Sequence, residues 1–288
     1  MRFLLFFALA RITAGQYVSS GVCRSCHPAE YAGHAGSGHA RALAVSVPPQ
    51  PGEWAFGAGL QAKTFVSRID EDTYLEHGLS WYAVTRSMAL TPGHRSPEGE
   101  KYRTFHPNTA IFRCFQCHST GPLRLGPGSR IQPFEEGVQC EACHGPGKEH
   151  IASGRAMRNP RKMTAAEVNE SCGACHRKPA AAGDDTDWTN PWNTRHQPLY
   201  LAESACFRKS GGRLSCLTCH PPHRPLSRVA ANYDAACSQC HPKPRHTVQR
   251  RGACVSCHMP AVSPSSLLHF ANHWIGVYAA GKPLRPIR

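Results

Sequence analysis

Hydrophobic and polar positions follow a strand-like pattern between residues 54 and 91. Residues 63–69 and 73–77 are rich in β-forming side chains and flank the polar run 70–72. This pattern predicts a β-hairpin with a polar turn. Residues 81–84 are predicted to form a third strand, whose aromatic side chains pack this segment against the rest of the chain.

The remaining sequence predicts short helices joined by loops. Pro28 stands in the first turn of a helix predicted to carry His34 and His39. Thr164 and Glu167 have the spacing of a capping box, which predicts a helix that runs into a later cysteine motif. The 25 glycines and 24 prolines disfavour long uninterrupted helices.

These patterns predict a mainly α and irregular chain with a small antiparallel β insert. The expected division is a signal peptide at residues 1–15, an N-terminal segment at 16–50, a β-containing insert at 51–105 and a C-terminal region at 106–288.

The first residues have the pattern of a secretory signal. Arg2 precedes an apolar run at residues 3–10, and cleavage is expected after Ala14 or Gly15. The run is too short to span a bilayer, although an uncleaved anchor is the alternative. No later segment is apolar enough to cross a membrane, so we expect a periplasmic or otherwise exported protein.

The cysteines carry the strongest chemical signal. Fourteen of the 15 cysteines fall into seven pentapeptides of the form Cys-x-x-Cys-His, whereas chance would give about 0.05 of them. We number them motif 1 to motif 7 in chain order; their cysteines are Cys23 and Cys26, Cys114 and Cys117, Cys140 and Cys143, Cys172 and Cys175, Cys216 and Cys219, Cys237 and Cys240, and Cys254 and Cys257.

This motif suits covalent haem attachment. Two thiols at this spacing can each add to one vinyl group of a haem, and the adjacent histidine reaches the iron. Structural zinc sites and disulfide frameworks also use cysteine pairs, but neither requires a histidine after every pair. We therefore expect seven covalently attached haem c groups, one in the N-terminal segment and six in the C-terminal region, with proximal ligands His27, His118, His144, His176, His220, His241 and His258.

Eleven histidines lie outside the motifs and are candidates for the second axial position. His223 follows the motif histidine His220 by three residues and cannot reach the opposite face of the same haem, so it would serve a neighbouring one. The same reasoning applies to His150 and His246. The distal candidates are His39, His106, His150, His223, His246 and His273, followed by His34, His94, His196 and His269. Methionines are too few to replace histidine throughout.

Cys206 remains outside the motifs. We interpret it as a buried, unreactive thiol, and a reactive or ligating thiol is the alternative.

The formal net charge of +14 would suit nucleic-acid binding, but the cofactors change this interpretation. Seven haems bring about 14 negative propionate charges, which offset the basic residues. We expect no nucleic-acid partner. A local basic face for an acidic redox protein remains open.

Four segments resemble multihaem c-type cytochromes of the cytochrome c-554 type, which are related to hydroxylamine oxidoreductase and to pentahaem nitrite reductases. They are Ser37-Gly-His-Ala-Arg-Ala42, the stretch from Gly137 through motif 3 to His150, motif 5 with Pro-Pro-His223, and Cys-His-Met-Pro260. The likeness covers roughly residues 17–45 and 104–275, and the insert resembles one in larger bacterial relatives. The resemblance implies stacked haem pairs, bis-histidine ligation and periplasmic electron transfer, with His39, His150, His223 and His246 as distal ligands. The chain has no Cys-x-x-Cys-Lys motif, so the lysine-ligated catalytic haem of nitrite reductases is absent.

Two functions follow from this resemblance and from the density of motifs. The first is an electron carrier rather than an enzyme, with a quinol-oxidising membrane complex or a periplasmic oxidoreductase as a redox partner. The alternative is a multihaem oxidoreductase with one open haem, acting on a small nitrogen or sulfur compound. Its pocket would use residues such as His77, His94, Tyr82 or Arg86.

The sparse apolar content predicts that the haems supply part of the core. We expect the haem-free polypeptide to be largely unfolded, with denaturant titration followed by circular dichroism as the measurement. Cooperative unfolding of a haem-free form would contradict this expectation.

Overall fold

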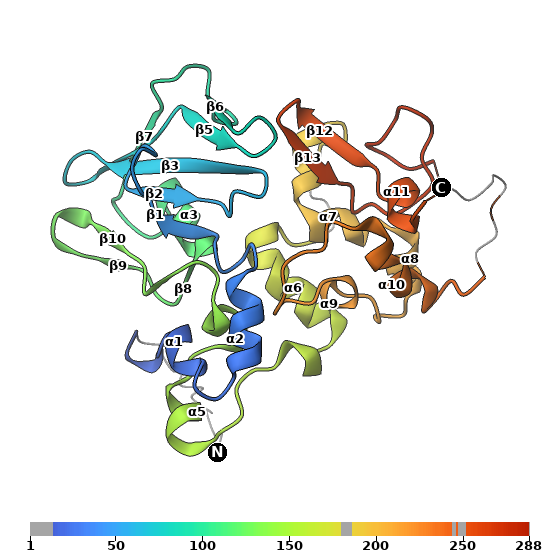
Figure 1. The fold of residues 1–288 in the computed structure, drawn as a ribbon, viewed down its shortest axis with the longest axis horizontal. Coiled ribbons are helices and arrows are strands. Elements are labelled where there is room, and N and C mark those ends of the chain that lie inside the picture. Colours follow the sequence, from blue (N-terminus) through green and yellow to red (C-terminus); the bar gives the residue numbers. More distant parts are fainter. Residues whose placement is uncertain (1–13, 180–185, 244–245, 247–251, 288) are drawn as a thin grey trace, which may run out of the picture.

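The computed structural model describes residues 14–179, 186–243, 246 and 252–287. The signal peptide predicted at 1–15 lies almost entirely outside these residues. Figure 1 shows a β-rich part coloured blue to green, and a part with helices and loops coloured yellow to red. Helices α1, α2 and α5 lie below the sheet in this view. No helix among the described residues is long and apolar enough to cross a membrane.

A seven-stranded antiparallel sheet forms the β-rich part. Strands β1, β2, β3, β4 and β7 are neighbours in that order, and β5 pairs with both β3 and β6. The strands are β1 (Leu43–Val45), β2 (Trp54–Phe56), β3 (Ala62–Arg68), β4 (Thr73–Glu76), β5 (Leu79–Tyr82), β6 (Ser87–Leu90) and β7 (Glu100–Arg103).

The predicted hairpin is confirmed, and the sheet around it is larger than the sequence predicts. Strands β3 and β4 pair antiparallel, with Val66 opposite Glu76. The third strand begins two residues earlier than expected, at Leu79. Strands β1, β2, β6 and β7 were not predicted: they are short, and β7 is a polar run that becomes a strand by pairing with β4. Their formation therefore depends on tertiary contacts more than on local pattern.

Outside this sheet, the chain contains short helices and two-stranded ladders. The α-helices are α1 (Ser20–Cys23), α2 (Pro28–Ala35), α3 (Ala110–His118), α4 (Cys140–His144), α5 (Lys148–Ser153), α6 (Ala165–His176), α7 (Gln197–Ala202), α8 (Ala205–Lys209), α9 (Cys216–Cys219), α10 (Asp234–Ser238) and α11 (Cys254–His258). The 3-10 helices are η1 (Ala14–Gln16), η2 (Pro127–Ser129), η3 (Pro160–Lys162), η4 (Pro191–Arg195) and η5 (Ala230–Tyr233). Three ladders pair β8 (Ser119–Thr120) with β11 (Glu135–Glu136), β9 (Arg124–Leu125) with β10 (Ile131–Gln132), and β12 (Ala261–Ser265) with β13 (Leu268–Ala271).

Two helix predictions had different outcomes. The capping box of α6 is confirmed, because Thr164 accepts from the Glu167 backbone and Glu167 accepts from the Thr164 backbone. The prediction that α2 carries both His34 and His39 is wrong for His39. The helix ends at Ala35, before the glycines at 36 and 38, and His39 lies in the following turn.

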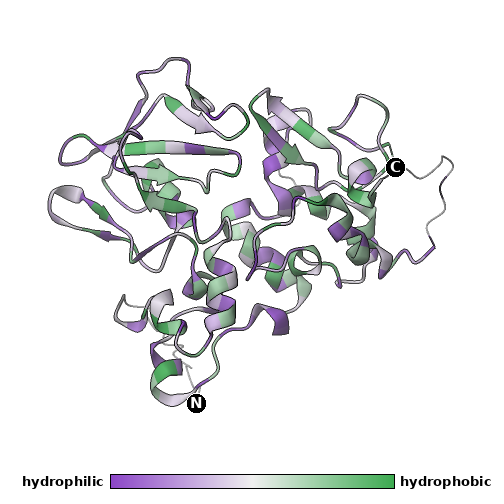
Figure 2. Cartoon of the chain, in the orientation of Figure 1, coloured by the Kyte–Doolittle hydropathy of each residue, from purple (hydrophilic) through white to green (hydrophobic). Residues whose placement is uncertain are grey.

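The main hydrophobic core lies between the sheet and α3. Phe115 is fully buried, and its ring contacts those of Trp54, Phe56 and Tyr74 at centroid distances of 5.5, 5.0 and 6.2 Å. The Tyr74 hydroxyl accepts a hydrogen bond from the Ile131 backbone, which ties the β9–β10 ladder to this core. In the helical part, Figure 2 shows hydrophobic and hydrophilic residues interspersed along the short helices.

Phe115→Ala is expected to lower the free energy of unfolding by about 3–5 kcal/mol, because it empties the centre of this core. Phe105→Ala is the matched control, since Phe105 is 66% exposed and its contact with Arg103 contributes at most about 1 kcal/mol. Denaturant titration of both haem-loaded variants measures the difference. Equal losses of stability would show that the sheet does not depend on this core.

Candidate haem-binding sites

Each motif lies on a helical turn. Helices α4 and α11 consist of the motif residues alone, and α3 and α6 end on the motif histidines. In motifs 1, 5 and 6, the histidine backbone N–H donates to the first cysteine carbonyl at 2.9–3.0 Å. Residues i, i+3 and i+4 of a helix share one face. The turn therefore directs both thiols and the imidazole to the same side.

Five motif histidines face a histidine from outside the motifs. The ring planes in these pairs meet at angles from 20° to 69°. The pairs, with their ring-centroid distances, are His27 and His150 (6.4 Å), His176 and His39 (6.0 Å), His144 and His223 (5.9 Å), His220 and His273 (6.2 Å), and His258 and His246 (6.2 Å).

Backbone carbonyls orient several of these imidazoles. The Nδ1 atoms of His144 and His258 lie 2.8 Å from the carbonyl oxygens of Arg158 and Gly276. A carbonyl oxygen can only accept, so Nδ1 carries the hydrogen and Nε2 keeps the lone pair that binds a metal ion. The same bond is made by three further histidines: His118 to Ala42, His150 to Arg155 and His273 to Ala271.

Burial keeps the imidazoles of His39 and His273 in the neutral, ligating form. Desolvation lowers the pKa of His39 to about 4, with smaller contributions from His176 and other histidines. Desolvation also lowers the pKa of His273 to about 4. At neutral pH both rings therefore have a free lone pair for iron.

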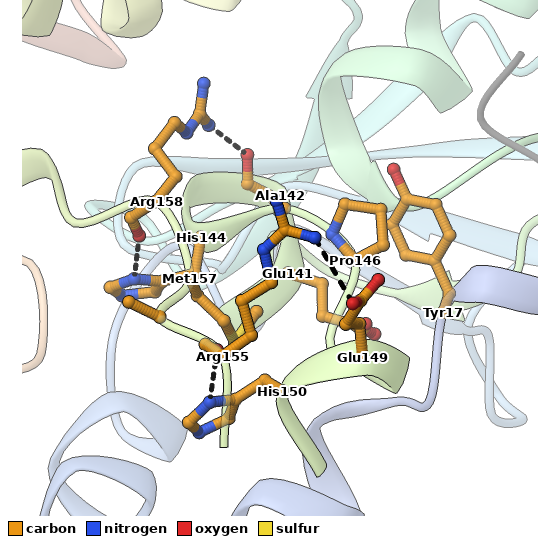
Figure 3. Close-up of a pocket in the computed structure, with 12 residues that line it drawn as sticks. Tyr17, Glu141, Ala142, His144, Pro146, Glu149, His150, Arg155, Met157 and Arg158 are labelled. Carbon is orange, nitrogen blue, oxygen red and sulfur yellow. Dashed lines mark hydrogen bonds and ion pairs between the residues drawn. The ribbon is translucent and has the colours of Figure 1, made fainter. Parts of the chain in front are cut away.

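A cavity of about 520 Å³ opens beside His144 and His150. Figure 3 shows Arg155 and Arg158 on its wall, with their carbonyl oxygens bonded to the two histidine rings. The Arg155 guanidinium pairs with Glu149, and that of Arg158 donates to the carbonyl of Cys143. The wall combines apolar surface with two arginines and two glutamates, Glu141 and Glu149.

Cysteines of different motifs lie next to each other. Hydrogen bonds join four thiol pairs: Cys23 with Cys140, Cys117 with Cys175, Cys172 with Cys216, and Cys237 with Cys254. Longer-range electrostatic interactions link Cys143 with Cys172 and Cys219 with Cys237. Six pairs of motifs are therefore neighbours.

A buried carboxylate holds motif 1 against motif 3. Glu141, inside motif 3, is 2% exposed and accepts hydrogen bonds from the backbone N–H groups of Val18, Ser19 and Gly147 at 2.6–3.2 Å. Glu135 accepts from the backbone of Ser20 in the same way. These bonds account for the proximity of Cys23 and Cys140.

Two other polar side chains join motifs in the same manner. Asn169 on α6 is buried, accepts from the Cys216 backbone at 3.0 Å and donates to the Leu214 carbonyl at 3.2 Å. Asp234 accepts from the Cys254 backbone at 2.8 Å. A backbone N–H at the start of one motif is thus satisfied by a side chain near another.

Comparisons with known proteins find similar chains among the multihaem cytochromes. The family model "Cytochrome c554 and c-prime" matches residues 79–145. The multihaem cytochrome MtrA of Shewanella baltica (strain OS185) is 24% identical over 199 residues, which make up 62% of this chain and 50% of MtrA. This chain is therefore similar to multihaem c-type cytochromes. It spans about half the length of the curated relative that it matches.

The fold of the cytochrome also resembles solved structures. The outer cell wall cytochrome OcwA matches with a TM-score of 0.57 and 16% identity, over 90% of this chain and 79% of OcwA. The undecahaem cytochrome from the S-layer of Carboxydothermus ferrireducens matches with a TM-score of 0.49 and 16% identity, over 80% of this chain and 43% of that one. The first match shows that the cytochrome shares its fold with OcwA.

Several histidines of the cytochrome have other neighbours. Both ring nitrogens of His34 face carbonyl oxygens, those of Pro222 and Val138. His269 bonds Ser263, and His94 lies against Glu76. His106 is exposed, and His196 precedes α7 with a buried Nδ1 that has no hydrogen-bond partner among the described residues.

Two of the residues expected to line an open-haem pocket, His77 and Tyr82, form hydrogen bonds within the insert. His77 is half-buried, and its Nε2 atom lies 2.7 Å from the Ser67 hydroxyl. The Tyr82 hydroxyl donates to the Leu90 carbonyl at 2.5 Å. In the second part of the chain, Cys206 is half-buried on α8, and burial raises the pKa of its thiol, as an unreactive cysteine requires.

Sequence reasoning missed the residues that join the motifs. Glu141 occupies a variable position of motif 3 and reads as a surface charge. The one sequence signal for Glu141 is its position: it is an acidic residue in the first turn of the short helix formed by motif 3. Nothing in the local sequence indicates that two of its partners, Val18 and Ser19, lie more than 100 residues away.

Glu141→Ala is expected to lower the free energy of unfolding of the cytochrome by at least about 2 kcal/mol, because it leaves three backbone N–H groups without their acceptor. Glu149→Ala is the control: its side chain is 66% exposed, and its ion pair with Arg155 contributes at most about 1 kcal/mol. Thermal unfolding of the two variants measures the difference. Similar melting temperatures would contradict the role assigned to Glu141.

Proposed function

We propose that this cytochrome transfers electrons between redox partners through seven covalently attached haem c groups, most of them ligated by two histidines. The five imidazole pairs are the observation that carries the proposal. Two metal–nitrogen bonds of about 2.0 Å, with about 1.2 Å from each nitrogen to its ring centre, separate two imidazoles on one metal ion by about 6.4 Å. The observed separations of 5.9–6.4 Å support one iron between the members of each pair.

The chain offers the residues that the haems need. The 14 motif cysteines would form the thioether bonds, and the seven motif histidines would be proximal ligands. We assign His150, His223, His39, His273 and His246 as distal ligands of the haems in motifs 1, 3, 4, 5 and 7. When bound, haem iron supplies one-electron redox chemistry, and the protein sets ligation and access.

Backbone groups tune these ligands. The carbonyl oxygens that accept from Nδ1 hold each ring in one orientation and increase the basicity of Nε2. Ser204, which is fully buried, donates to the His273 carbonyl at 3.0 Å and accepts from the Ile275 backbone at 2.7 Å. The distal position of His273 is therefore fixed through the backbone.

The neighbouring cysteines support an order for the haems, which we number after their motifs. Thiol hydrogen bonds link motifs 1 and 3, 4 and 5, and 6 and 7, and electrostatic interactions link motifs 3 and 4 and motifs 5 and 6, so these six motifs form an unbranched series. Motif 2 contacts motif 4 through Cys117 and Cys175. We infer a continuous electron path from haem 1 to haem 7, with haem 2 as a side branch.

Haems 2 and 6 have no assigned distal histidine. Among the described residues, no ring contact joins His118 or His241 to another imidazole. His118 packs instead against Phe56, with ring centroids 5.4 Å apart. This contact favours a second candidate function, in which haem 2 has an open iron and acts on a small nitrogen or sulfur compound. His106, His196 and His269 remain candidates for the two positions.

We infer that the protein is exported and works outside the cytoplasm, with redox proteins as partners. The apolar run at residues 3–10 and the covalent haem chemistry support export. The relative OcwA is named for the outer cell wall. A quinol-oxidising membrane complex or a periplasmic oxidoreductase is the proposed class of partner, and no nucleic acid is proposed.

Low-temperature EPR of the oxidised holoprotein, with haem quantified in the same sample, tests this function. We expect seven haems per chain and predominantly low-spin signals. His273→Ala should convert one haem equivalent to high spin, because it removes the distal ligand of haem 5. His77→Ala is the control and should leave the spectrum unchanged, because His77 bonds Ser67 within the insert.

Unchanged spin state in His273→Ala would contradict the assigned pairing, and a haem content other than seven would contradict the assignment of all seven motifs. A high-spin signal of about one equivalent in the unsubstituted protein would favour the oxidoreductase function over a pure carrier.

A further inference from the structure

Three potential metal ligands meet at one edge of the β sheet, apart from the assigned haem ligands. Glu76 ends β4 and Glu100 begins β7, and the two are directly paired across the strands. His94 comes from the loop between β6 and β7. One ligand atom from each of the three residues lies within 4.8 Å of the other two.

The loop that carries His94 is held in place by its own hydrogen bonds. Thr91 is buried, and its hydroxyl donates to the His77 carbonyl at 2.7 Å and contacts the Ser80 hydroxyl at 2.8 Å. The His94 backbone N–H donates to the Thr91 carbonyl at 3.0 Å. His94 is therefore positioned by a buried polar network.

A glycine permits the close approach of this loop to the end of β4. Gly99 has a φ of +90°, and a Cβ atom there would lie 2.3 Å from the carbonyl oxygen of Glu76. A side chain at position 99 would push the loop away from Glu76.

The two carboxylates have an incomplete set of donors. The Tyr102 hydroxyl lies 3.0 Å from Glu76 and 2.8 Å from Glu100, but it has only one hydrogen to donate. Two neighbouring negative charges thus share one neutral donor, which favours a cation between them.

The imidazole of His94 completes the group. Its side chain is 4% exposed, and Nε2 has no hydrogen-bond partner among the described residues, although it lies 3.4 Å from the Glu76 carboxylate. A buried ring nitrogen directed at two carboxylates, without a hydrogen bond of its own, is the donor that a metal ion would use.

We propose that His94, Glu76 and Glu100 bind a divalent first-row transition metal ion of the Mn²⁺, Fe²⁺ or Zn²⁺ class. One imidazole with two carboxylates suits these ions, whereas Mg²⁺ and Ca²⁺ prefer oxygen ligands alone and Cu⁺ prefers sulfur. Glu100 is exposed, so water can occupy the remaining coordination positions. The site does not rest on the proposed electron-transfer function.

The position of the site links it to motif 2. The charge of Glu76 acts on Cys114, the first cysteine of that motif. A cation bound to Glu76 would offset this negative charge beside the second haem. The ion would thus change the electrostatic environment of the haem that forms the side branch.

Mn²⁺ binding to the chelator-treated holoprotein tests the proposal. Room-temperature EPR of free Mn²⁺ measures the bound fraction, and Zn²⁺ is added as a competitor. We expect one Mn²⁺ per chain, displaced by Zn²⁺. His94→Gln and Glu100→Gln should each weaken Mn²⁺ binding at least about tenfold, because each removes one of three ligands. Glu98→Gln, in the same loop, is the control and should bind as the unsubstituted protein does.

Two readouts separate loss of the site from other causes. The haem absorption spectrum of Glu100→Gln should be unchanged, since the exposed amide retains the Tyr102 contact. The haem spin state of His94→Gln should also be unchanged. The proposal is overturned if the unsubstituted protein binds no Mn²⁺ or Zn²⁺, or if both variants bind like the control. It is also overturned if His94→Gln alone converts a haem to high spin, because His94 would then be an iron ligand.

Discussion

A histidine that follows its own cysteine pair can approach a haem from only one side. The imidazole for the other side has to come from another segment, and this requirement shapes the rest of the molecule. In the pairs found here, His150 follows motif 3 and faces motif 1, while His39 follows motif 1 and faces motif 4. Each proposed haem would therefore join two parts of the chain. Short helices would suffice for such a fold, because bound haems would supply much of the apolar surface against which the helices pack.

The polypeptide reinforces these links with buried polar groups. The Glu141 carboxylate accepts hydrogen bonds from backbone N–H groups that precede motif 1. The Asn169 side chain accepts one from the backbone N–H of Cys216, the first residue of motif 5. Helical turns of four or five residues leave most of their N–H groups without a partner inside the helix. Satisfying those groups with a side chain from another motif both stabilises the turn and sets the distance between motifs. Each of these side chains thus has a structural and a positional role.

The β-rich part follows a different principle. Its core of Phe115, Trp54, Phe56 and Tyr74 is made by protein side chains, and Phe115 itself lies between the cysteines of motif 2. Motif 2 is thereby built onto a sheet, while the other motifs are built onto short helices and loops. The same sheet brings Glu76, His94 and Glu100 to one edge. A haem bound at motif 2 would consequently have surroundings unlike those of a haem at the other motifs.

The candidate haem-attachment residues are evident from the local sequence alone. Cys-x-x-Cys-His requires only five consecutive residues, so the family, the candidate proximal histidines and the cysteines are local information. The β3–β4 hairpin and the capping box of α6 were predictable for the same reason. The tertiary structure decided which histidine faces which motif, since His39 and His176 are separated by 137 positions and no local pattern pairs them. It also decided that the polar run Glu100–Arg103 is a strand and that Glu141 is buried, because both depend on hydrogen-bonding partners distant in the chain.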